Sequence, residues 1–75
     1  MTMVNDAARN WLNGLKGIAA NCRRMATEAT ENSRSASDPL LKEMHLRRAD
    51  DNMKAAMAIE EECAALEAKM SPSRV

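Results

Sequence analysis

Residues 31–39 read ENSRSASDP and separate two segments that each carry the apolar spacing of a helix. The part before Asp38 has no apolar period, and its Ser, Asn and Arg side chains favour a turn with local side-chain hydrogen bonds. Asp38 can cap a following helix, and Pro39 suits the first helical position because it has no backbone N–H to leave unsatisfied. We therefore expect a turn over residues 31–38 and a helix that begins at Pro39.

The segment before the turn has the pattern of one amphipathic helix. Asn5 or Asp6 can cap its start, which predicts a helix over about residues 6–30. Its main apolar stripe alternates spacings of three and four residues, as expected of a helix–helix contact, and a neighbouring row widens it. The stripe consists of Ala8, Trp11, Leu15, Ile18, Cys22, Met25 and Ala29, and the neighbouring row consists of Leu12, Ala19 and Ala26.

The segment after the turn should form a longer helix, over about residues 39–70, because the Ser-Pro pair at residues 71–72 stops it. It carries two apolar stripes, of which one can pack on the first helix while the other requires another subunit. Residues beyond about Cys63 should overhang the shorter first helix, so that Leu66 and Met70 are buried between protomers or only partly buried. The main stripe is Leu41, His45, Ala49, Asn52, Ala56, Ile59, Cys63, Leu66 and Met70, and the second is Leu46, Met53, Met57 and Ala64.

Size and composition support the same architecture. The 75 residues make one domain at most, with 14 Ala, 7 Met, one Trp and no Phe or Tyr, so each buried position contributes little apolar area. A chain below roughly 80 residues seldom has a core that stabilises it alone. We predict an all-α fold, a single domain over residues 1–75 built as a two-helix antiparallel hairpin that assembles into a homo-oligomeric helical bundle. Residues 71–75 form a polar tail with no structural expectation.

Composition also limits the classes of function. Eleven basic and eleven acidic side chains cancel, which removes the positive field of a non-specific nucleic-acid binder, and no short recognition helix for duplex DNA is expected. Without a long apolar run or a signal-peptide pattern, the sequence predicts a soluble cytoplasmic protein with no membrane contact. Cys22 and Cys63 are expected as reduced thiols. One His with two distant Cys predicts neither a zinc site nor a catalytic pair, so no enzyme, metal or cofactor is expected.

An arginine cluster is the main candidate for ligand binding. Folding the hairpin about the middle of the predicted turn places Arg23 and Arg24 against Arg47 and Arg48, with His45 beside them. Guanidinium groups fit phosphate oxygens, so this zone predicts a phosphate site. The alternative is that the same side chains form ordinary i,i+3 and i,i+4 ion pairs on a solvated helix surface.

Asn52 and Trp11 have two candidate roles each. Asn52 either fixes the helix register or lines a pocket with His45 and Arg48. Trp11 either packs in the core or offers its indole for stacking on a nucleobase. Since Trp11 lies about 18 Å along its helix from Arg23, both can touch one small ligand only if a second protomer packs antiparallel and completes the site.

The arrangement resembles the anti-CBASS sponge family, small helical-hairpin proteins of phages that sequester cyclic oligonucleotide messengers. The matching features are a turn with a Ser-Arg pair, here at residues 33–34 or loosely SDP at residues 37–39, and a following helix with leucine, paired acids and an Ala-rich apolar stretch. That stretch reads LRRADDNMKAAMAI over residues 46–59. The match covers roughly a third of the chain, and Met53 and Lys54 stand where the family has an aromatic residue.

The resemblance implies a multi-subunit helical assembly without catalytic activity, in the cytoplasm of an infected bacterium, that holds a cyclic di- or trinucleotide in pockets between protomers. Trp11 and Arg23 or Arg24 fit the stacking and basic roles by residue type and approximate place. We therefore predict a counter-defence sponge, and the alternative hypothesis is a small helical adapter or inhibitor that binds a host protein or structured RNA. The predicted ligand-binding residues are Trp11, Arg23, Arg24, His45, Arg48 and Asn52.

Overall fold

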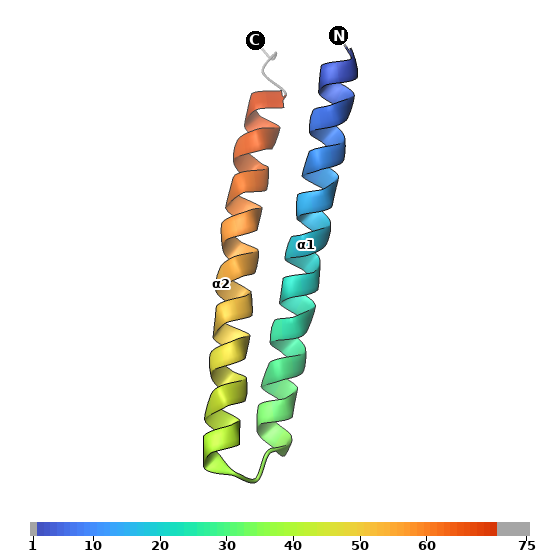
Figure 1. The fold of residues 1–75 in the computed structure, drawn as a ribbon. Helices are drawn as coiled ribbons and strands as arrows, with labels where there is room; N and C mark the ends of the chain where they lie inside the picture. Colours follow the sequence, from blue (N-terminus) through green and yellow to red (C-terminus); the bar gives the residue numbers. More distant parts are fainter. Residues whose placement is uncertain (1, 71–75) are drawn as a thin grey trace.

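The computed structural model describes residues 2–70, with side chains from Asp6 onward. It consists of two helices, α1 (Thr2–Ser35) and α2 (Pro39–Met70), which run antiparallel side by side with their free ends together (Figure 1). The hairpin is long and thin, with Cα extents of 56 × 20 × 12 Å. The prediction of an all-α antiparallel hairpin is confirmed, whereas residues 71–75 lie outside the described residues.

The turn is shorter than the sequence predicts. α2 spans the expected residues, and its start is capped because Asp38 Oδ1 accepts a hydrogen bond from the Leu40 N–H at 3.0 Å. The prediction of a turn over residues 31–38 is wrong, because α1 continues to Ser35 and only residues 36–38 connect the helices. Ser and Thr hydroxyls in the last turns of α1 donate to carbonyls three or four residues earlier, so they are satisfied within the helix.

The contact between the helices is built from small side chains. In α2, Ala49, Ala56 and Cys63 are buried at intervals of seven residues, and His45 with the other half-buried members of the predicted main stripe lies beside them. Leu41, at the start of that stripe, is exposed instead. The buried side chains of α1 are Leu12, Ala19, Ala26, Ala29 and Ser33. Because the closest residues are mostly alanine, the helix axes can approach to the lower end of the usual spacing of about 8–10 Å.

The contact row of α1 differs from the predicted main stripe. Trp11, Ile18 and Met25 are 61%, 53% and 42% exposed, respectively. Of that stripe, Ala29 is buried and Leu15 and Cys22 are half-buried, so they take part in the contact together with the neighbouring row of Leu12, Ala19 and Ala26. The two rows differ by one residue, which is about 100° around a helix of 3.6 residues per turn. Since α2 presents alanines, the alanine row of α1 packs most closely, and the larger side chains are turned out of the contact.

The predicted overhang of α2 is not observed. α1 has 34 residues and α2 has 32, so the helices lie side by side over nearly their whole length (Figure 1). Leu66 and Met70 are partly buried, which is one of the two alternatives that the sequence predicts. In the predicted second stripe, Leu46 and Met57 are about half exposed.

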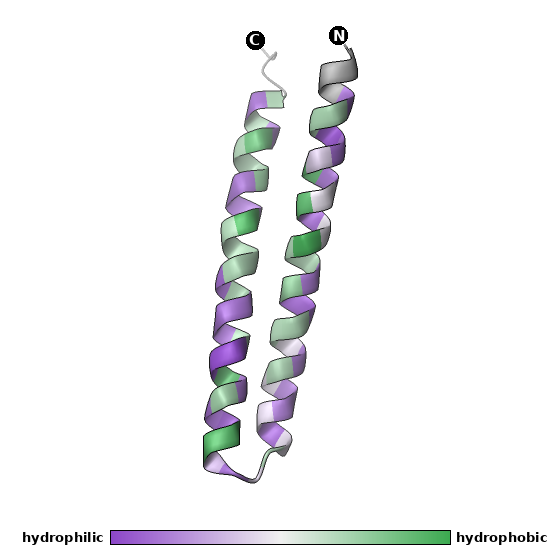
Figure 2. Cartoon of the chain, in the orientation of Figure 1, coloured by the Kyte–Doolittle hydropathy of each residue, from purple (hydrophilic) through white to green (hydrophobic). Residues whose placement is uncertain are grey.

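Polar and apolar residues alternate along both helices (Figure 2). Neither helix has, within the described part of the chain, a stretch that is both long and apolar enough to cross a membrane.

Candidate functional site

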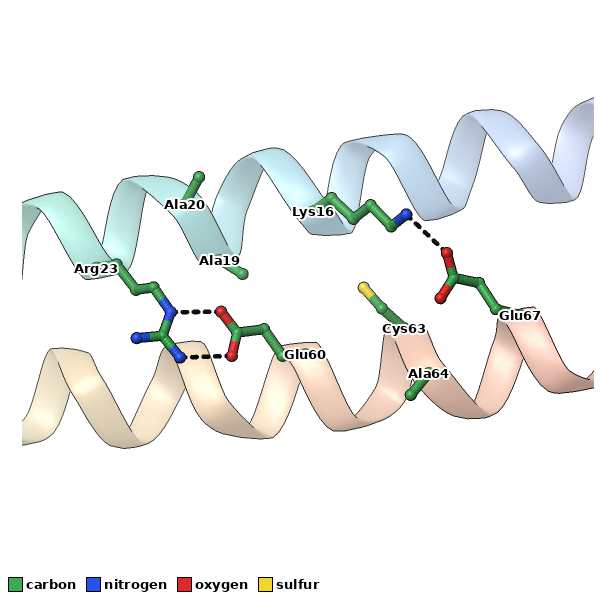
Figure 3. A pocket seen from close by; sticks show the side chains of 8 residues that line it. All are labelled: Lys16, Ala19, Ala20, Arg23, Glu60, Cys63, Ala64 and Glu67. Carbon is green, nitrogen blue, oxygen red and sulfur yellow. Dashed lines mark hydrogen bonds and ion pairs between the residues drawn. The ribbon is translucent and has the colours of Figure 1, made fainter.

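Two ion pairs connect the helices along one face of the hairpin (Figure 3). The guanidinium of Arg23 donates to both carboxylate oxygens of Glu60, with Nε–Oε2 and Nη2–Oε1 distances of 2.5 and 2.7 Å. Lys16 Nζ donates to Glu67 Oε2 at 2.7 Å. Arg23 Nη1 also lies 3.5 Å from the sulfur of Met53. Arg23 is therefore held beside the middle of α2.

The predicted cluster of four arginines does not form. Arg23 contacts Glu60 and Met53, whereas Arg47 forms an ion pair with Glu43 of its own helix at 3.9 Å. The physical reason is the length of the turn. Because α1 extends to Ser35, the chain folds back later than predicted, and each residue of α1 faces a part of α2 more than one helical turn further along.

A cleft of about 340 Å³ lies between the two ion pairs (Figure 3). Its floor is apolar, and its rim carries Lys16, Arg23, Glu60 and Glu67. The hydrogen bond and the charge of Glu60 raise the pKa of Arg23, and the hydrogen bond from Arg23 lowers the pKa of Glu60. The hydrogen bond to Glu67, together with its charge, raises the pKa of Lys16. The rim cations are thus neutralised within the chain, and a phosphate would have to displace Glu60 before Arg23 could bind it.

This cleft is not predicted by the apolar pattern of the sequence. The available signal is the spacing of charges that flank the contact rows: Lys16 and Arg23 are seven residues apart, as are Glu60 and Glu67. Opposite charges at the same spacing on two antiparallel helices indicate ion pairs across a coiled-coil-like contact.

A smaller cleft of about 100 Å³ lies nearer the turn, on the other face of the hairpin. It is lined by Met25, Glu28, Ala29, Asn32, His45 and Arg48. Here the structure brings together two of the predicted site residues, the half-buried His45 and the exposed Arg48. Among residues 6–70, whose side chains the structure describes, none forms an ion pair or hydrogen bond with the Arg48 guanidinium. This group is therefore available for an anionic ligand.

The remaining predicted residues are dispersed. The amide of Asn52 donates to the carbonyl of Arg48 at 3.0 Å, so it is bonded to its own helix. Arg24 donates to the side-chain oxygen of Asn21 one turn earlier on the outside of α1. Trp11 is exposed in the single hairpin, and it lies fourteen residues, or about 21 Å, from Met25 at the smaller cleft. A single hairpin therefore does not combine the indole with the basic groups.

Both thiols are free, Cys22 half-buried and Cys63 buried. Among the described residues, no three His, Cys, Asp or Glu side chains come together in a way that could hold a metal ion.

Comparisons of the chain with protein-family models, with curated proteins and with solved structures find no match. The function is therefore inferred from the chemistry of the two faces.

Proposed function

We propose that the chain is a non-enzymatic binding protein that sequesters a cyclic oligonucleotide between the subunits of a helical assembly. The observation that supports this most is the cleft where Arg48 and His45 lie together. A guanidinium without a partner in its own chain offers several N–H donors in a planar fork, which fits phosphate oxygens. In an infected bacterium, such a protein would lower the free concentration of an immune messenger and so act as a phage counter-defence sponge.

The exposed indole of Trp11 supports a nucleotide as the ligand. An aromatic ring that is 61% exposed can stack on a base, and such stacking contributes about 1–3 kcal/mol per base. Because Trp11 lies far from Arg48 within one hairpin, the indole that reaches this cleft must come from another subunit. The site as proposed is therefore incomplete in the monomer.

The six predicted residues have unequal parts in this proposal. Arg48 and His45 contact the phosphates, and Trp11 stacks on a base. Arg24 is a peripheral basic group, and Arg23 takes part only if the ligand releases it from Glu60. Asn52 positions the backbone at Arg48 through its amide hydrogen bond.

Calorimetry and native mass spectrometry with a panel of cyclic di- and trinucleotides test the proposal. Binding at tens of micromolar or below is expected, with quenching of the single tryptophan's fluorescence. A hydrogen bond to a charged group contributes about 1.5–3 kcal/mol, so Arg48→Ala should weaken binding roughly ten- to a hundredfold. Arg47→Ala is the matched control, because Arg47 only pairs with Glu43 on the outside of α2. No heat and no change in fluorescence with any nucleotide would overturn the proposal.

A second candidate is a helical adapter or inhibitor that binds a host protein. It is favoured by the row of Trp11, Ile18 and Met25, which exposes apolar side chains without a charge in the row. Such a surface suits a protein partner better than structured RNA, whose phosphates require cationic contacts. Host-protein binding that persists in the Arg48→Ala variant, without any nucleotide binding, would support this candidate over the sponge.

A further inference from the structure

The face of the hairpin opposite the two ion pairs is called here the open face. It is formed by Trp11, Ile18 and Met25 of α1 and by the side of α2 that carries Arg48 and Glu62. On α1, the contact row of Leu12, Ala19 and Ala26 separates this face from Lys16 and Arg23, because the two sets lie on either side of that row on a helical wheel. We propose that a second copy of the chain covers the open face, with the two turns at opposite ends of a four-helix dimer.

The exposed area of the hairpin supports a partner of this size. A compact monomer of 8.3 kDa is expected to expose about 4,600 Å². The chain exposes 5618 Å², which is an excess of about 1,000 Å² over that expectation. A standard protein–protein interface covers about 800 Å² on each partner. An interface of standard size on one face is comparable in area with this excess.

The apolar row of α1 is evenly spaced on either side of Ile18. Trp11 and Met25 lie seven residues on either side of Ile18, and all three are about half exposed. A rotation by 180° about an axis that passes Ile18 at right angles to the helix places the Trp11 of one copy against the Met25 of the other. It also places the two copies of Ile18 against each other. The contact is self-complementary, as a two-fold interface requires.

Two charged residues of α2, Arg48 and Glu62, are evenly spaced on either side of Ala55. Arg48 and Glu62 are exposed and lie seven residues on either side of Ala55, on the same side of α2. Ile18 and Ala55 are 19 and 18 residues from Ser37 in the turn, and on this count we place them at a similar height along the hairpin. The same rotation therefore brings the Arg48 of each copy to the Glu62 of the other, which forms two ion pairs of opposite charge. The apolar row and the charges are therefore both compatible with one axis.

The ion-paired face is a poorer interface. Lys16, Arg23, Glu60 and Glu67 already pair across it within the chain, and covering them would remove water from four charged groups. Met57 is exposed nearby and provides a matched test of that face.

Sedimentation equilibrium of the full chain, without any nucleotide, tests the dimer. A mass of twice 8.3 kDa is expected at micromolar concentration. Ile18→Glu should dissociate the dimer, because it places two carboxylates against each other in an apolar contact. Met57→Glu should leave it intact. A wild-type mass of 8.3 kDa, or dissociation by Met57→Glu but not by Ile18→Glu, would overturn the inference.

Charge reversal gives a test that does not depend on the stability of the hairpin. Arg48 and Glu62 are exposed, so replacing either leaves the helix contact unchanged. Arg48→Glu and Glu62→Arg should each weaken the dimer by about tenfold or more, and the double variant should restore the wild-type constant. Failure of the double variant to restore dimerisation would overturn the assignment of this pair and of the axis.

A cysteine cross-link reports the orientation directly. In a chain with Cys22→Ala and Cys63→Ala, Ala55→Cys places one thiol near the proposed axis in each copy, and rapid disulfide formation between copies is expected. Ala68→Cys, exposed near the end of α2, should not cross-link. Cross-linking at residue 68 but not at residue 55 would refute the arrangement.

The dimer does not rest on the proposed ligand, so it can hold when no nucleotide binds, whereas a chain that stays monomeric would refute both proposals because the nucleotide site needs a second subunit. Glu62→Ala separates the two roles of Arg48, because it removes the intersubunit ion pair while keeping the guanidinium for a phosphate. Glu62→Ala should weaken the dimer as much as Arg48→Ala does. At protein concentrations high enough to keep the Glu62→Ala variant dimeric, the variant should still bind the nucleotide.

Discussion

Ala56→Leu is expected to destabilise the hairpin because Ala56 occupies its tightest contact. Ala56 is 0% exposed and Ala19 is 2% exposed, and both lie 18 or 19 residues from Ser37, so they are level with each other. Leucine adds three carbon atoms at a position that has no exposed surface. Either the helices move apart or the new side chain takes a strained rotamer, and overpacking of this kind costs about 1–3 kcal/mol.

Urea unfolding followed by far-UV circular dichroism, at one fixed protein concentration, measures the effect. The free energy of unfolding should fall by about 1–3 kcal/mol, and the melting temperature by about 4–8 °C for each kcal/mol lost. Ala68→Leu is the control, because Ala68 is exposed on the same helix and the two residue types have similar helix propensity. If the two variants unfold within about 0.5 kcal/mol of each other, the helices are not closely packed at Ala56 and the reasoning is refuted.

Two further predictions concern the turn and the ion pairs. Asp38→Ala removes the side-chain acceptor of the Leu40 N–H and should lower the free energy of unfolding by about 1 kcal/mol in the same urea assay, whereas an unchanged midpoint would contradict the cap. Arg23 lowers the pKa of Glu60 below its ordinary value of 4.5, so this pair stabilises the fold above that pH and its contribution is lost as the pH falls through the lowered pKa. Melting temperatures measured from pH 7 to pH 2 should therefore fall on acidification, and they should fall less steeply in the Glu60→Gln variant. The same dependence of melting temperature on pH in both proteins would exclude a stabilising Arg23–Glu60 ion pair.

The start of α2 could be predicted because local chemistry determines it. Asp38 and Pro39 act on the first turn alone, whatever the rest of the chain does. The end of α1 could not be predicted in the same way. Ser and Thr hydroxyls can bond either in a turn or back to the preceding helical turn, and the buried Ser33 takes the second option. Which option is more stable depends on the packing of α2 against those residues.

The candidate site depended on the register, which the sequence leaves open. Placing Arg23 opposite Arg47 required the turn to begin at residue 31, five residues before it does, and in the structure Arg23 pairs with Glu60 instead. The choice of contact row was wrong in part, at Trp11, Ile18 and Met25, for a related reason. The apolar area that can be buried favours the larger side chains of Trp11, Ile18 and Met25 in the contact. Close approach of α1 to the alanines of α2 instead favours alanine on α1. Side-chain size has to be considered on both helices together.

The two faces of the hairpin have different consequences for function. Charges on one face are neutralised within the chain, while the other face carries exposed apolar groups and an available guanidinium. The proposed dimer places the Trp11 of one copy against the Met25 of the other, and Met25 lines the cleft that holds His45 and Arg48. A symmetric pair of hairpins would therefore have two such composite sites, one near each turn, and in each of them a nucleotide phosphate would compete with Glu62 of the partner subunit for Arg48. Saturation at two nucleotides per dimer, with tryptophan quenching lost in Ile18→Glu, is the result that both proposals together require.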